Sequence, residues 1–136
     1  MAHGQRSMII EPERVRLWAQ VAAEAADDKK ATDTVILDVG AVLAITDLFL
    51  ITSGANTRQV RTIADEIERQ LKERADVAPV RTEGRRDLTW VLLDYGPLVV
   101  HVFSEEMRRF YDIERLYRDV PIERFRSTGT LAEEAG

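Results

Sequence analysis

Two stretches of the chain repeat their apolar residues with the spacing of an amphipathic helix. The first covers residues 11–30, and Pro12 suits its first turn. The second begins at Asn56, which forms a capping-box-like start with Gln59, and ends near Arg74. Its apolar positions fall at i, i+3, i+4, i+7 and i+11, and they are Val60, Ile63, Ala64, Ile67 and Leu71.

Five shorter stretches, rich in apolar or β-branched residues and bounded by turn residues, predict strands. One of them, from Leu48 to Thr52, is apolar with little interruption, which is typical of a central strand covered on both faces. Pro79 favours an edge position for its strand, because proline cannot donate a hydrogen bond to a neighbouring strand. We expect the strands at residues 34–39, 48–52, 79–83, 88–94 and 98–103.

Two short helices follow the last strand. Ser104 is placed to cap the first of them, which carries acids in its first turn and arginines in its last. The second is expected at residues 112–118, before Pro121. The order of the main elements is therefore α-β-β-α-β-β-β-α. It predicts an α+β sandwich of two or three layers, with a mixed sheet flanked by helices.

Length and composition narrow the possibilities further. A chain of 136 residues fits one domain, which we place at residues 11–125, with residues 1–10 and 126–136 as disordered or tag-derived tails. The absence of cysteine excludes disulfides, thiolate nucleophiles and cysteine-bound metals. No apolar run reaches the ~18 residues of a membrane helix and no signal peptide is evident, so we expect a cytoplasmic protein without a membrane contact.

The net charge of −5 bears on the kind of partner. Proteins that depend mainly on nucleic-acid phosphates are usually basic, because neutralising phosphate supplies most of their affinity. We therefore expect this acidic chain to bind mainly a protein, with RNA contacted at most at the periphery.

Ser53-Gly54 invites a catalytic interpretation. It lies between a buried strand and a helix start, where backbone N–H groups can hold an anion. A nucleotidyltransferase would also need paired carboxylates on the following strands to hold Mg²⁺, and these strands offer Asp94 alone. His101 is the only histidine inside the domain, and one histidine makes no metal site. We expect no enzyme activity, metal or cofactor, and a simple helix entry at the glycine.

The last predicted hairpin carries aromatic and polar groups that suit recognition. Trp90, Leu92 and Asp94 share one face of their strand, and Tyr95 follows at the turn. An aromatic ring beside an acid is typical of a binding hot spot. Core packing for Trp90, turn chemistry for Asp94 and a structural role for His101 remain open as alternatives.

Charged residues flank this hairpin on both sides. Arg81, Arg85 and Arg86 form a small basic cluster, either solvated or in peripheral contact with RNA phosphate. The helix after the hairpin has the composition of a solvated face, although Arg109 and Tyr111 are candidates to flank a docking surface.

Two blocks of the sequence resemble the ribosomal silencing factor family, also called the Iojap or RsfS family. They are ITDLFLITSGANTRQVRTIADEI, residues 45–67, and WVLLDYGPLVVHVFSEEMRRFYDIERLY, residues 90–117. Both stand in the family's order, and the resemblance extends over roughly residues 15–121. It implies a mixed five-stranded sheet with a nucleotidyltransferase-like core, here without the catalytic carboxylates.

The resemblance also implies a function. Such a factor binds the large ribosomal subunit through its fourteenth ribosomal protein and sterically blocks joining with the small subunit, repressing translation under nutrient limitation. It is often a homodimer when free. The partner-binding residues that it implies are Trp90, Leu92, Asp94, Tyr95 and His101, with Arg109 and Tyr111 nearby. A nucleotidyltransferase-fold enzyme and a generic homodimerisation module remain as alternatives.

Overall fold

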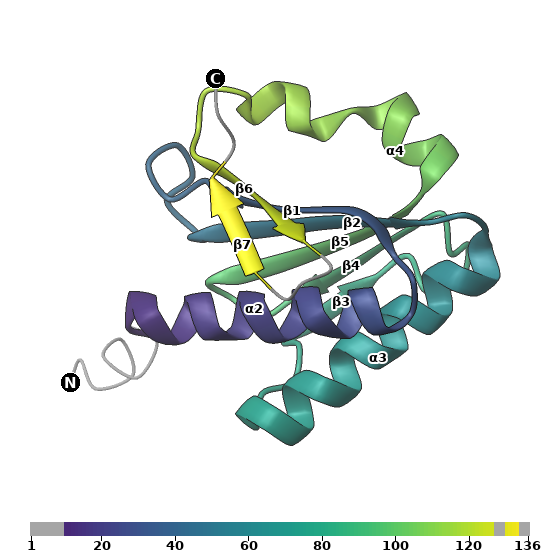
Figure 1. The fold of residues 1–136 in the computed structure, drawn as a ribbon, viewed down its shortest axis with the longest axis horizontal. Helices are drawn as coiled ribbons and strands as arrows, with labels where there is room; N and C mark the ends of the chain where they lie inside the picture. Colours follow the sequence, from purple (N-terminus) through teal and green to yellow (C-terminus); the bar gives the residue numbers. More distant parts are fainter. Residues whose placement is uncertain (1–9, 127–129, 134–136) are drawn as a thin grey trace.

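The computed structural model describes residues 10–126 and 130–133 (Figure 1). The helices are α2 (Pro12–Asp28), α3 (Thr57–Ala75), α4 (Glu105–Tyr111) and the 3₁₀ helix η1 (Ile113–Tyr117). The strands are β1 (Thr32–Asp38), β2 (Leu48–Gly54), β3 (Arg81–Glu83), β4 (Trp90–Asp94), β5 (Leu98–Ser104), β6 (Ile122–Arg126) and β7 (Thr130–Glu133). Within the described ranges, no helix has the length and apolar character needed to cross a membrane.

The strands form one mixed sheet in the order β3-β4-β5-β2-β1-β6-β7. Its centre is parallel, with β2 paired to β5 along their whole length, and the other pairs are antiparallel. A parallel pair needs a crossover connection, which here passes through α3. β4 and β5 form the expected hairpin, with Trp90 opposite Phe103 and Asp94 opposite Val99.

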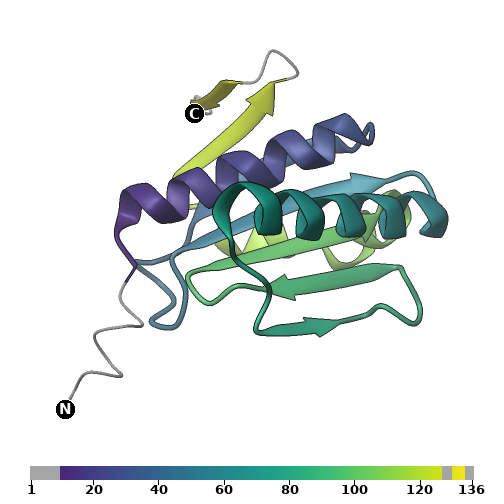
Figure 2. The same ribbon diagram turned by 90° about the horizontal axis from the view of Figure 1, so that it is seen from below.

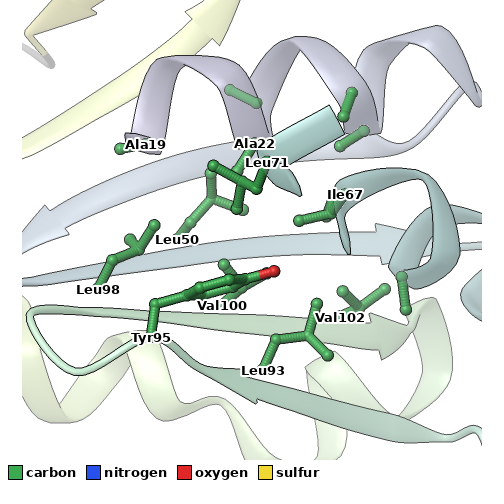
Figure 3. Close-up of a cluster of buried hydrophobic side chains, with 14 of the residues drawn as sticks. Ala19, Ala22, Leu50, Ile67, Leu71, Leu93, Tyr95, Leu98, Val100 and Val102 are labelled. Atoms are coloured by element: carbon green, nitrogen blue, oxygen red, sulfur yellow. The ribbon is translucent and has the colours of Figure 1, made fainter. Parts of the chain in front are cut away.

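Helices α2 and α3 lie side by side on one face of the sheet (Figure 2). Their apolar stripes pack on the side chains of β2, β4 and β5 that point toward them, such as Leu50, Leu93 and Val100 (Figure 3). α3 starts as predicted, because the Asn56 side chain accepts a hydrogen bond from the backbone N–H of Gln59 at 2.9 Å. This layer contains the larger of the two apolar clusters.

The opposite face of the sheet is covered by α4 and η1 (Figure 1). Here Phe49 and Phe103 of the sheet pack against half-buried Met107, Ile113 and Tyr117. Neither α4 nor η1 contributes a fully buried residue. This cover is therefore thinner than the α2–α3 layer, and several outward-facing side chains of β4 and β5 stay half-buried.

The α+β class and the mixed sheet are confirmed, but the sheet has seven strands rather than the expected five. β6 pairs with β1, and β7 pairs with β6. The segment IERFR gave no strand signal because a strand near a sheet edge tolerates charged side chains.

The expectation of a disordered tail at residues 126–136 is accordingly wrong for Arg126 and for residues 130–133. Of the first predicted tail, Ile10 is described and packs at the margin of the core. Residues 1–9, 127–129 and 134–136 lie outside the described residues.

Candidate functional site

The outward surface of the β4–β5 hairpin, beside α4, is the candidate site. Residues directly opposite each other on antiparallel strands point to the same face of the sheet. By this register, one face of the hairpin carries six side chains, of which Phe103 is fully buried. We call the other five the ribbon face, and they are Trp90, Leu92, Asp94, Val99 and His101. All of these except His101 are half-buried. The ribbon face therefore presents apolar groups and one carboxylate on a rigid sheet.

Trp90 is held by three neighbours. Its ring stacks on Phe103 with ring centres 4.7 Å apart, and Tyr111 lies against it at 4.9 Å. Its indole Nε1 donates a hydrogen bond to Nδ1 of His101 at 3.2 Å. Trp90 thus packs against the core, as the core interpretation predicts, while the residue stays half-buried and leaves the recognition interpretation open.

His101 forms the floor of the ribbon face and is only 4% exposed. Because an indole N–H can only donate, Nδ1 is the unprotonated nitrogen and Nε2 carries the hydrogen. Nε2 is buried and has no hydrogen-bond partner among the described residues. Burial lowers the pKa of His101 to about 4, so the imidazole is neutral at physiological pH. These properties fit a structural group, whose ring lies near the rings of Phe49 and Phe103.

Folding stability should fall as the pH is lowered from the unfolded-state pKa of His101 toward its folded-state pKa. Its pKa is 6.5 unfolded and about 4 folded, so the stabilisation is complete above pH 6.5 and is lost progressively down to about pH 4. The loss amounts to ~3 kcal/mol at most. Urea unfolding at pH 7.5, 6 and 5 measures it. His101→Phe, which has no titratable ring, should show a shallower decline, and an equal slope in both proteins would contradict the assignment.

Asp94 is the last residue of β4, and its carboxylate contacts both the following turn and a neighbouring strand. Its Oδ1 accepts a hydrogen bond from the backbone N–H of Gly96 at 2.8 Å, as turn chemistry predicts. Its Oδ2 lies 3.3 Å from Nη2 of Arg81 on β3. The carboxylate is thus fixed in position, with its side chain 20% exposed on the ribbon face.

Tyr95 does not belong to the ribbon face. It is 5% exposed and lies in the core beneath α2 and α3, as Figure 3 shows. Its hydroxyl has no hydrogen-bond partner among the described residues. Burial raises the pKa of this hydroxyl, and the charge of Glu68 adds to the effect. Tyr95 follows Asp94 and therefore points to the other side of the sheet, so the structure does not bring it together with the other predicted residues of the hairpin.

Replacing Tyr95 with phenylalanine should stabilise the protein or leave its stability unchanged. The substitution removes a buried, unpaired hydroxyl and retains the ring, which favours the folded state by ~1 kcal/mol. Thermal unfolding measures this change. A loss of several degrees in Tm would show instead that the hydroxyl has a stabilising partner.

The outer surface of α4 and η1 adjoins the ribbon face. Tyr111 is 50% exposed and contacts Trp90, so this predicted residue joins the ribbon face at its border. Arg109 is exposed on α4, where it lines a hollow together with Tyr111. The sequence interpretation missed Phe110 and Leu116, which are 73% and 76% exposed, because their surroundings have the composition of a solvated helix.

The Ser53-Gly54 segment, at the end of β2, is occupied by the protein's own groups. Nη1 of Arg108 donates to the Ser53 hydroxyl at 2.8 Å, and the same guanidinium holds the Glu114 carboxylate through bonds of 3.0 and 2.9 Å. A Cβ on Gly54 would lie 3.1 Å from Ile63 Cδ1, so glycine permits the close approach of α3. Among the described residues there is no group of three or more His, Asp or Glu side chains placed to hold a metal ion.

Comparison with known proteins decides the family. Over residues 12–135 the chain matches the family model described as "Ribosomal silencing factor during starvation". The chain belongs to the ribosomal silencing factor family. The silencing factor RsfS of Bacillus subtilis is 40% identical over 103 residues, which is 76% of this chain and 86% of that protein.

Two further similar proteins extend the comparison. The mouse protein named "Mitochondrial assembly of ribosomal large subunit protein 1" is 30% identical over 92 residues, 65% of this chain and 40% of that one. A crystal structure of a protein from Chromobacterium violaceum is similar with a TM-score of 0.73 and 35% identity, covering 76% of this chain and 85% of that chain. The fold is therefore that of solved silencing-factor relatives.

Proposed function

We propose that this silencing factor binds the large ribosomal subunit through the ribbon face and sterically prevents the small subunit from joining. The observation that carries the proposal is the half-buried Trp90, held rigidly on the same strand face as Leu92 and Asp94 in a chain of this family. Rigid aromatic anchors have the character of binding hot spots. The partner that we propose is the fourteenth protein of the large subunit, at the subunit interface.

The chemistry of the ribbon face favours a protein as the main partner. Its exposed groups are an indole, aliphatic side chains and a carboxylate, and the carboxylate would repel RNA phosphate. The chain's net charge of −5 also disfavours binding to RNA phosphate. The names of the relatives, a ribosomal silencing factor and a protein of large-subunit assembly, agree with a ribosomal partner.

A steric mechanism requires only that the protein binds the large subunit and is bulky enough to block joining, so we propose no catalytic step. The groups that nucleotidyl transfer would recruit are engaged elsewhere: Ser53 with Arg108, and Asp94 with Arg81 and Gly96. We further propose that the protein acts in the cytoplasm, repressing translation when nutrients are limiting. A homodimer in the free state would cover part of the exposed apolar surface.

Co-sedimentation with purified large subunits tests the proposal and separates it from a generic dimerisation module. Wild-type protein is expected to move with the subunits through a sucrose gradient, while a generic module would remain at the top. Leu92→Lys places a charge on the ribbon face and should abolish co-sedimentation. Leu17→Lys is the matched control, since Leu17 is 55% exposed on α2, on the other side of the sheet. Equal loss in both variants would contradict the placement of the interface.

A further inference from the structure

The arginines expected to reach RNA are not free to do so. Arg81 forms ion pairs with Glu83 and Asp94, and Arg85 forms ion pairs with Asp65 and Glu68. Each of these guanidiniums is neutralised by two carboxylates. The basic cluster of the hairpin therefore has little net charge to offer a phosphate. Within the described residues, Arg86 is its one member without an ion pair.

A different set of arginines is uncommitted. In the described parts of the chain, Arg109, Arg115 and Arg118 form no ion pair and all three are exposed. They line one hollow of about 680 Å³ on the outside of α4 and η1, together with the exposed side chains of Phe110 and Leu116. We call these five residues the α4–η1 strip. Three free guanidiniums and an open aromatic ring thus converge on one surface.

We propose that the α4–η1 strip binds a short single-stranded segment of ribosomal RNA, which rests on the proposed function and adds a second partner to it. A guanidinium binds phosphate oxygens in a bidentate manner, and arginine is preferred for this purpose. An exposed aromatic ring offers a stacking platform for an unstacked base, and such bases occur in the loops and bulges of structured RNA. The strip supplies both kinds of group within one hollow.

The acids around the hollow limit the length of the RNA contact. Asp112 and Asp119 also line it, so the hollow carries three positive and two negative side chains. This balance disfavours a long run of phosphates along a duplex groove. It is compatible with one or two nucleotides whose phosphates lie at the arginines and whose base stacks on Phe110. The contact therefore contributes to placement on the subunit and does not dominate affinity.

The strip and the ribbon face are close enough to act together. Tyr111 packs on Trp90 with ring centres 4.9 Å apart, and Phe110 packs edge-on against Tyr111 at 5.1 Å. A chain of aromatic contacts thus connects the strip to the ribbon face. Ribosomal proteins are embedded in RNA, so a factor bound to one of them through the ribbon face would bring the strip toward neighbouring RNA.

The test compares two double variants of the full chain on two probes. Arg115→Ala with Arg118→Ala removes two arginines of the strip, while Arg58→Ala with Arg61→Ala removes two exposed arginines of α3, on the other face of the sheet. The probes are purified large subunits and the isolated fourteenth large-subunit protein, each titrated at several salt concentrations.

The Arg115→Ala, Arg118→Ala protein, which we call the strip variant, should bind large subunits more weakly than the wild type. The slope of log K against log salt concentration should become shallower by about 1.4, which is ~0.7 for each lost phosphate contact. The Arg58→Ala, Arg61→Ala protein should bind large subunits with the affinity and salt dependence of the wild type. The isolated fourteenth large-subunit protein should bind the wild type and both double variants with equal affinity. Phe110→Ala should also lower affinity for the subunits by roughly fivefold or more. Its exposure of 73% makes a folding defect a poor explanation of such a loss.

Each other outcome overturns the RNA contact in a recognisable way. An unchanged slope and affinity of the strip variant would refute it and leave the proposed function intact. Weaker binding of the strip variant to the isolated protein would identify a protein partner for the strip instead. Wild-type protein that fails to bind large subunits would refute the proposed function, and the RNA contact with it.

Discussion

Trp90→Ala should weaken binding to the large subunit by at least ~2 kcal/mol, or about thirtyfold. The indole is the broadest side chain of the ribbon face, and it also positions its neighbours. It stacks on Phe103, supports Tyr111 and donates a hydrogen bond to His101. The same contacts predict a loss of folding stability of ~3 kcal/mol. Affinity measured by titration and unfolding measured in urea separate the two effects.

Trp90→Phe is the matched control for this substitution. Phenylalanine retains an aromatic ring against Phe103 but lacks the N–H that reaches His101, so its affinity should lie between those of the wild type and the alanine variant. A folded Trp90→Ala protein with wild-type affinity would contradict the hot-spot assignment. If that variant unfolds, Leu92→Ala tests the same surface, because Leu92 is half-buried and does not belong to the apolar cluster of Phe49 and Phe103.

Gly84→Ala should destabilise the protein by ~3 kcal/mol or more, although it adds only one methyl group at an exposed position. Gly84 adopts a φ of +86°, in the region that favours glycine. A Cβ at this position would collide with the backbone carbonyl of Trp90. The substitution therefore forces the β3–β4 connection away from β4. Urea unfolding measures the loss, and binding to large subunits should decline with it.

Gly96→Ala is the control that distinguishes the steric collision with Trp90 from the strain of a positive φ. Gly96 has a similar φ of +91°, but a Cβ there would meet nothing within 4 Å. Its substitution should therefore cost only the strain of a positive φ, ~1 kcal/mol. Equal destabilisation by the two substitutions would show that strain alone, rather than the contact with Trp90, explains the need for glycine.

Most of the fold could be predicted because its signals are local. The helical period of α3, its Asn56 cap and the apolar run of β2 each fix an element without knowledge of distant residues. β6 and β7 carried no such signal. The place of β6 depends on the free edge of β1, a tertiary feature, and β7 in turn pairs with β6. The charged side chains of β6 are tolerated near a sheet edge.

The candidate site was harder to predict than the fold. Alternation along β4 placed Trp90, Leu92 and Asp94 correctly on one face, and the same alternation, continued by one residue, would have excluded Tyr95. The partners of charged residues were beyond prediction, because they lie far apart in the sequence. Arg108, for example, reaches Ser53 across 55 positions, and Arg85 reaches Asp65 across 20.

The central claim is that this silencing factor keeps the ribosomal subunits apart by occupying their interface. Light scattering during the mixing of purified large and small subunits measures their association directly. With the large subunits first saturated with wild-type protein, the rise in scattering should be suppressed, and Leu92→Lys protein should leave it unchanged. An undiminished rise with saturating wild-type protein would contradict the claim.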